Sequence, residues 1–251
     1  MRKTEYDEYP LYKGCIPEGS FGAVYPLSIA EKIQSGDIYT DGSSCLFRHR
    51  CGFGNIYGKC GEAFLDEIYK TFLSAESRPE GRFVLMTADE AEKDFFAGKP
   101  DVSVGRRYYF EYPGNALPQE RALPDGMELH ETDDVLFDRC KGRIVPLFSW
   151  EDKQSFLKRG KGFCVTDGDR VAACAFSSAV SGREIDIGVE TAEGYRKRGL
   201  AYTAARAMIE YILKENKRPV WACSSENEGS RRLAESLGFV KTAECYTIGR
   251  R

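Results

Sequence analysis

The sequence has 251 residues, of which 36 are basic and 39 acidic, giving a net charge of -3. This near balance excludes a global field that would favour nucleic acid or an anionic membrane, so any anion site must be local. The length favours two domains over one, and 42% hydrophobic residues are enough for a sizeable core.

The sequence also bears on the compartment in which the chain works. No apolar run approaches the ~20 residues of a membrane span, and the first residues lack the apolar core of a signal peptide. The nine cysteines are an odd count, which favours reduced thiols over a disulfide framework. We therefore expect a cytoplasmic protein with no nucleic-acid or membrane partner. The oligomeric state is not predicted.

One group of potential metal ligands occurs early in the chain. Cys45, His49, Cys51 and Cys60 lie close together in sequence, but they contain no CxxC pair. Zinc sites usually bring paired ligands at short spacing. The pattern favours buried thiols on a strand with an exposed His49, and no metal site is expected.

The first forty residues show weak periodicity, with one short helix predicted at 27–33. A strand is predicted at 44–50. The glycine-rich segment 52–58 contains neither a dinucleotide fingerprint nor a phosphate loop, so we interpret it as a hairpin turn.

An α/β layer is predicted from about 40 to 112. Apolar residues at helical spacing predict a helix at 62–73. A strand follows at 82–86, and a capping box that begins at Thr87 starts a helix ending near Gly98. A strand at 106–112 closes the layer.

Proline and glycine crowd into residues 113–126, which marks an exposed connection. We place the domain boundary there, giving domains at 1–116 and 117–251. The second domain is predicted to contain strands at 127–131, 162–166, 171–178, 184–191, 220–223 and 239–248 and helices at 133–140, 149–160, 200–214 and 226–237. The expected fold class is α/β (α+β), with a mixed central sheet and flanking helices.

The segment between the strand at 184–191 and the helix at 200–214 carries the clearest chemistry. Backbone amides at a helix N-terminus bind a diphosphate, the helix dipole favours its charge, and basic side chains add charge-assisted contacts. A glycine lets the backbone come close to the ligand. The residues expected at this anion site are Arg196, Lys197, Arg198, Gly199, Leu200 and Ala201.

This segment resembles the signature Arg/Gln-x-x-Gly-x-Gly/Ala of the GNAT superfamily of N-acetyltransferases. The resemblance extends to the strand that ends at Thr191, to Asn227-x-x-Ser230, and to the Leu-Gly-Phe run that ends at Phe239. It covers about residues 124–249. It implies acetyl-coenzyme A as cofactor and transfer of its acetyl group to a primary amine of a small molecule or peptide.

The resemblance assigns roles to further residues. Backbone groups of Val189, Glu190 and Thr191 are expected to bind the pantetheine arm, which Asn227 and Ser230 flank. Direct attack needs a neutral amine, so a carboxylate must remove its proton, often through water. Glu184 and Asp186 share one face of their strand and are the candidate bases, although either could be an ordinary strand carboxylate.

One position departs from the family pattern. Many members place a tyrosine seven residues after the asparagine, where this chain has Ala234. Either Tyr246 takes its place as the acid, or the thiolate leaves unaided. Asn227 also has a structural alternative, because a capping box from Ser225 to Glu228 would place it in the first helical turn.

The N-terminal half lacks the anion loop. By resemblance to tandem enzymes, we interpret 1–116 as a degenerate GNAT-like domain that shapes or covers the substrate site, and 117–251 as the catalytic domain. The Trp221 strand and the two-domain length look most like the branch typified by zwittermicin-resistance acetyltransferases. The alternatives are a non-catalytic acyl-CoA sensor and a protein that uses the fold only for assembly.

Overall fold

The computed structural model describes residues 1–77, 81–114 and 116–251, and these form two compact units. Unit 1 comprises Met1–Tyr109, Cys223–Glu226 and Ala243–Arg251, and unit 2 comprises Phe110–Ala222 and Asn227–Thr242. The units are discontinuous in sequence, whereas the two domains predicted from the sequence meet at a single boundary after residue 116. Residue 115 of the predicted connection lies outside the described residues.

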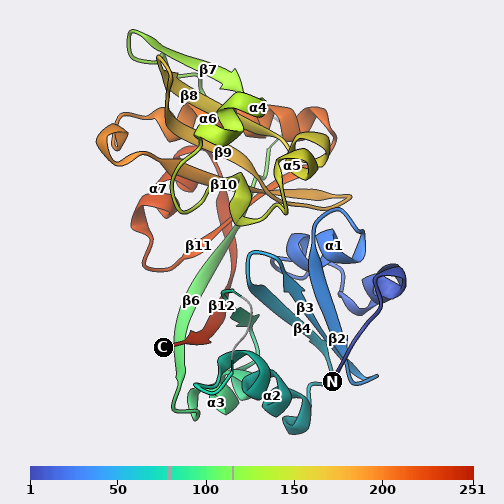
Figure 1. Ribbon diagram of the computed structural model, residues 1–251. Coiled ribbons are helices and arrows are strands. Elements are labelled where there is room, and N and C mark those ends of the chain that lie inside the picture. The colour runs from blue at the N-terminus through green and yellow to red at the C-terminus, as the bar shows by residue number, and fades with distance from the viewer. Residues whose placement is uncertain (78–80, 115) are drawn as a thin grey trace. The chain divides into compact units, whose positions relative to one another are not determined.

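Unit 1 contains a mixed sheet with helices on it (Figure 1). Its strands are β1 (Arg2–Lys3), β2 (Gly36–Thr40), β3 (Ser44–His49), β4 (Phe53–Gly58), β5 (Val84–Thr87), most of β6 (Val102–Glu111) and the second half of β12 (Val240–Arg250). Strands β2, β3 and β4 are antiparallel neighbours, and β4 pairs with β5 in parallel. The mixed pairing follows from the helical crossover between β4 and β5, because only a long connection can return a chain parallel to its neighbour.

The helices of unit 1 cover two apolar clusters. They are the 3-10 helix η1 (Tyr6–Cys15), α1 (Val24–Ala30), α2 (Glu62–Ile68), which continues as a π-helical turn (Tyr69–Leu73), and α3 (Glu90–Ala97). One cluster joins Phe64 and Ile68 of α2 with Phe96 of α3, and α2 lies beside α3 (Figure 1). The other joins Ile29 of α1 with Phe47 of β3. Burial of such side chains contributes about 1.5–3 kcal/mol each.

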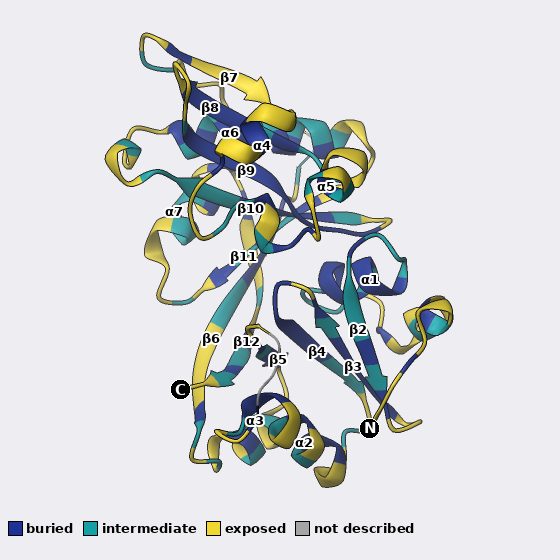
Figure 2. Ribbon diagram, in the orientation of Figure 1, coloured by how far each residue is buried: buried dark blue, intermediate teal, exposed yellow. Residues whose placement is uncertain are grey.

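Unit 2 contains strands in the order β11-β10-β9-β8-β7. These are β7 (Met127–Glu131), β8 (Gly162–Asp167), β9 (Arg170–Val180), β10 (Glu184–Thr191) and most of β11 (Arg218–Ser224). Its helices are α4 (Asp134–Arg139), η3 (Pro146–Phe148), α5 (Lys153–Arg159), η4 (Glu193–Tyr195), α6 (Leu200–Lys214) and α7 (Glu228–Ser236). The apolar face of α6, including Met208 and Ile209, packs on β8, β9 and β10. Figure 2 shows the buried residues concentrated along β8 and β9.

The expected mixed sheet with flanking helices is confirmed, and α6 and β10 have the predicted bounds. The hairpin turn expected at 52–58 is wrong, because residues 53–58 form β4. The chain turns just before β4, where Gly52 has φ 87°. Gly54 has a packing role instead, since a Cβ there would lie 2.7 Å from the Phe83 ring. Asp89 rather than Thr87 caps α3, by accepting a hydrogen bond from the Glu92 amide.

Candidate active site

The loop that precedes α6 is held in an unusual backbone conformation. Gly199 is the N-cap residue with φ 78° and ψ 0°, and Lys197 also lies in the left-handed region at φ 62°. A Cβ on Gly199 would meet no atom within 4 Å, so the space beside this backbone is open. Other side chains make a positive φ costly, which explains why the position needs glycine.

The amides at this helix end are available to a ligand. Within the described parts of the chain, no hydrogen bond is found from the backbone amides of residues 197–201, and the first amides of a helix have no partner inside it. The side chains of Arg196, Lys197 and Arg198 are exposed around them. Tyr195 braces the loop, because its hydroxyl donates to Asp167 at 2.9 Å. Together these groups form a site for an anion.

Strands β10 and β11 pair in parallel only over Glu184–Asp186 and Arg218–Val220, although both strands continue beyond this ladder. We call the place where their pairing ends the fork. On its other edge β10 pairs with β9 as far as Thr191, with a bulge between Asp186 and Ile187. Backbone groups of β10 beyond Asp186, including those of Val189 and Thr191, can therefore face a ligand rather than β11.

The two candidate bases lie in different surroundings. Glu184 accepts a hydrogen bond from Arg218 Nε at 3.0 Å, and Arg218 also bonds Glu111 at 3.0 Å. The Arg218 guanidinium held on Glu184 Oε1 competes with an amine proton for that oxygen. Asp186 is 4% exposed and is the last residue of β10 paired with β11, at the point where the fork opens.

Glu190 has a task that the sequence analysis did not identify. Its Oε2 accepts hydrogen bonds from the amides of Arg143 at 3.1 Å and Ile144 at 2.8 Å. A Cβ at Gly142, which has φ 137°, would lie 2.6 Å from Glu190 Cγ. The carboxylate therefore clamps the turn between α4 and η3 onto β10. In the sequence, only Gly142 in that turn indicates a close contact between the turn and Glu190.

Asn227 and Ser230 hold the start of α7. Asn227 is the N-cap, with its side-chain oxygen 3.0 Å from the Ser230 amide, so the expectation that it lies in the first helical turn is wrong. An asparagine side chain competes for free amides and so favours the cap position. The Ser230 hydroxyl accepts from Trp221 Nε1 at 3.0 Å. Ala234 is fully buried in the same helix.

Tyr246 belongs to unit 1, whereas every other candidate residue belongs to unit 2. Its hydroxyl donates to a carboxylate oxygen of Glu90. This hydrogen bond, with burial and the Glu90 charge, raises the pKa of Tyr246. Lys93 and Arg106 lie over its ring. A raised pKa makes the phenol a weaker acid.

The early cysteines and His49 form no metal cluster among the residues described. The expectation of an exposed His49 is wrong, because its side chain is 1% exposed. Its Nδ1 lies 3.1 Å from Cys51 Sγ and accepts the Cys51 amide at 3.2 Å. Burial lowers the pKa of His49 to about 3. Packing against Tyr25 explains this burial, since the two rings meet edge to face. His130, by contrast, is exposed and contacts Glu128 at 3.0 Å.

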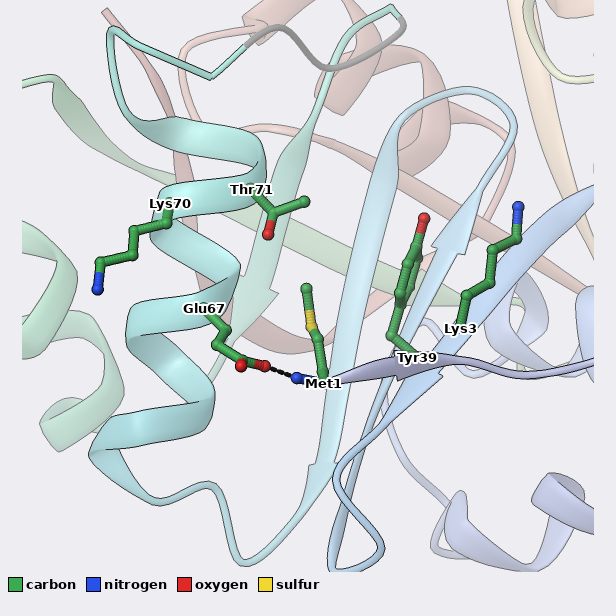
Figure 3. A pocket seen from close by; sticks show the side chains of 6 residues that line it. All are labelled: Met1, Lys3, Tyr39, Glu67, Lys70 and Thr71. Atoms are coloured by element: carbon green, nitrogen blue, oxygen red, sulfur yellow. Dashed lines mark ion pairs between the residues drawn. The ribbon is translucent and has the colours of Figure 1, made fainter.

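A cavity of 390 Å³ in unit 1 is lined by Met1 and by residues of β1, β2, α2 and the π-helical turn that follows α2 (Figure 3). Its charges are already balanced. The Met1 ammonium group pairs with Glu67, while Lys3 pairs with Asp37 and Lys70 with Asp66. Figure 3 shows Met1 lying between α2 and Tyr39, and Lys70 pointing away from them. This cavity offers no uncompensated charge to a ligand. No helix in the described chain combines the length and apolar character needed to cross a membrane.

Comparison with known proteins places this geometry in a family. The model of the family described as GNAT acetyltransferase matches residues 25–248. The chain is 25% identical over 229 residues to a Bacillus subtilis (strain 168) protein named as an uncharacterized N-acetyltransferase, YdfB, covering 88% of this chain and 87% of that protein.

Solved structures share the fold. A GCN5-related N-acetyltransferase-like protein from Streptococcus suis 89/1591 has a TM-score of 0.76 at 21% identity, covering 98% of this chain and all 100% of the other. A protein described as a tandem GNAT protein from the clavulanic acid biosynthesis pathway has a TM-score of 0.56 at 12% identity, covering 98% and 93%. The matched family model spans most of the sequence, and the chain belongs to the GNAT acetyltransferase family.

Proposed function

We propose that this protein is an N-acetyltransferase that moves the acetyl group of acetyl-coenzyme A to a primary amine of a small molecule or peptide by direct attack. The observation that carries the proposal is the left-handed Gly199 at the N-terminus of α6, beside the fork between β10 and β11. A cytoplasmic location remains part of the same proposal.

The cofactor would follow this geometry. Its diphosphate would lie on the amides of residues 197–201, with charge-assisted contacts from the exposed basic side chains. The pantetheine arm, which carries amide groups, would add to the free edge of β10 through the backbone of Val189, Glu190 and Thr191. Asn227 and Ser230 would flank the arm from α7. The Asn227 cap uses only the side-chain oxygen, so its amide nitrogen stays available as a donor.

The proposed reaction needs one base. The amine nitrogen attacks the thioester carbonyl carbon, the C–S bond breaks, and the coenzyme leaves as a thiolate. A backbone amide of β10 would stabilise the developing oxyanion. Asp186 is the favoured base, acting directly or through water, because it is the last residue of β10 paired with β11, at the point where the fork opens.

Release of the thiolate requires no dedicated acid, since a thiol pKa near 8.5 makes it a good leaving group near neutral pH. Tyr246 was the candidate acid from the sequence. Its raised pKa and its bond to Glu90 argue that it contributes little.

The cofactor site can be tested with two matched glycines. Gly199→Val should weaken coenzyme A binding at least tenfold, because the side chain strains a left-handed residue and projects into the open space. Gly126 also has φ 78° and a Cβ there also meets no atom within 4 Å, so Gly126→Val controls for backbone strain. Isothermal titration calorimetry provides the measurement. Equal coenzyme A affinity in a folded Gly199→Val variant would refute the proposed site.

We also propose that the N-terminal half is a second, degenerate copy of the fold. In unit 1 the order is β2-β3-β4-α2-β5-α3, and in unit 2 it is β8-β9-β10-α6-β11-α7. Each series contains an antiparallel run followed by a parallel crossover. This repeated topology supports a tandem enzyme. Membership of the branch typified by zwittermicin-resistance acetyltransferases rests only on the sequence around Trp221 and on the two-domain length.

A second candidate function is a non-catalytic acyl-CoA sensor. The buried Ala234, where many relatives have a tyrosine, favours it. Acetyl transfer across a panel of primary amines distinguishes the two, since a sensor binds acetyl-coenzyme A without turnover. A protein that uses the fold only for assembly would not bind the cofactor tightly.

A further inference from the structure

Unit 1 contains its own strand fork, and a cavity lies at it. Strands β4 and β5 pair in parallel over Phe53–Asn55 and Val84–Met86, and β4 continues to Gly58. A cavity of 260 Å³ is lined by residues 55–58 and 86–89, together with Ser20, Phe21 and Glu92. Ligand pockets for drug-sized molecules start near 300 Å³, so this cavity suits a smaller ligand.

The charge of the lining is entirely negative. Asp89 and Glu92 are its charged residues, and in the parts of the chain that the structure describes neither forms an ion pair. Burial and the Asp89 charge raise the pKa of Glu92. A positive group inside the cavity would offset both effects. Lys59 is the only basic residue between β4 and α2, and it does not line the cavity, so a diphosphate has no matching charge here.

The acidic side chains are fixed in place by local hydrogen bonds. The Thr87 hydroxyl donates to Glu92 Oε2 and accepts from the Asp89 amide at 3.0 Å. The Glu92 amide donates to Asp89 Oδ1 at 2.9 Å. The Cys60 thiol also forms a hydrogen bond with Glu92. Asp89 keeps an oxygen that these bonds do not use, and the Glu92 oxygens have further lone pairs for another donor. These bonds hold the exposed Asp89 and the half-buried Glu92 in place.

Asn55 provides an independent sign of a ligand. It is 4% exposed and lines the cavity, yet its side chain makes no hydrogen bond to any residue within the described ranges. The Asn55 side-chain atoms are not among the solvent-shielded polar atoms that lack a partner, so they keep contact with the open space of the cavity. A ligand N–H could therefore reach the Asn55 oxygen.

We propose that this cavity binds a small molecule carrying a primary ammonium group, with Glu92 and Asp89 as counter-charges and Asn55 as a further acceptor. Phe21, Tyr57 and Met86 would cover its hydrocarbon part. The ammonium group has three donors, which matches two carboxylates and one amide oxygen. The inference does not depend on acetyl transfer in unit 2.

The full-length protein and n-butylamine hydrochloride provide the test. At pH 7 butylammonium should raise the melting temperature saturably, while n-butanol and sodium butyrate at equal concentration and ionic strength should not. Glu92→Gln should weaken butylammonium binding at least tenfold, because it removes a charge-assisted acceptor. Asp94→Asn removes a negative charge from the exposed side of the same helix and should leave binding unchanged.

A second variant separates a ligand site from a structural role. Asn55→Leu should abolish butylammonium binding while keeping the melting temperature, since it removes no hydrogen bond to another described residue. A destabilised Asn55→Leu variant would overturn the proposal, as would equal responses to butylamine and butanol. Glu92→Gln should bind coenzyme A like the wild type. Failure of the proposed ammonium site is therefore distinguishable from failure of the proposed acetyl transfer, which Gly199→Val tests.

Discussion

At the scale of single residues, neighbours decide what each charged side chain can do. Glu184 and Asp186 are equivalent by strand periodicity, but Arg218 engages only the first in the hydrogen bonds described above. Glu190 looks like a third carboxylate on the same face and instead binds two backbone amides. Sequence spacing identified the strand face, and only tertiary contacts distinguish the carboxylates on it.

We expect Asp186→Asn to lower kcat by about a hundred- to ten-thousand-fold, the usual contribution of a positioned base. Coenzyme A affinity should stay nearly unchanged, and the loss should shrink at high pH, where the amine is already neutral. The measurement is a pH–rate profile, with folding checked by circular dichroism. Glu184→Gln is the matched control and should cost far less. If folded Asp186→Asn keeps wild-type turnover at neutral pH, another residue must be the base.

His49 should make stability depend on pH. Burial lowers its folded pKa to about 3 from an ordinary 6.5, so the unfolded chain binds the extra proton between these values. The stabilisation is complete above pH 6.5 and is lost as pH falls toward 3, by about 1.4 kcal/mol per pH unit. Urea unfolding at pH 7, 6 and 5 measures this slope.

His49→Asn should reduce the slope, because no buried imidazole then has to stay neutral. His130→Asn is the control, since His130 is the other of two histidines and is exposed. Identical slopes in all three proteins would contradict the assignment.

At the scale of elements, the site depends on how strands and helices end. Gly199 ends a loop and begins α6, Asn227 begins α7, and the β10–β11 ladder stops at Asp186. Each of these ends leaves backbone groups that a ligand can use. The bounds of α6 and β10 were predictable from periodicity, whereas the fork was not, because it is a property of two strands together.

Glu190→Ala should loosen the turn between α4 and η3. Hydrogen bonds to a charged group are worth about 1.5–3 kcal/mol, so exchange of the Arg143 and Ile144 amides should accelerate about tenfold or more. Hydrogen exchange followed by NMR gives the readout, with exposed Glu193→Ala as the control. Unchanged protection of both amides would show that the clamp contributes little.

At the scale of the whole molecule, one family model covers both units, but the candidate cofactor residues all belong to unit 2. Acetyl-coenzyme A should therefore slow hydrogen exchange in residues 187–203 and leave β2, β3 and β4 unaffected. Mass spectrometry of peptic peptides measures the difference, and Gly199→Val is the control that should show no such protection. Protection confined to unit 1 would contradict this prediction.

The sequence by itself determined the mixed α/β fold, the approximate places of most helices and strands, and the loop at 196–201, because hydrophobic periodicity and glycine preferences act over short stretches of chain. It misjudged β4, since the glycines of 52–58 resemble a turn until Phe83 packs on Gly54. Tertiary structure alone buried His49, gave Glu190 its two amides and brought Asn55 to the same cavity as two acidic residues. Burial and hydrogen-bond partners come from residues distant in sequence, so local pattern does not encode them.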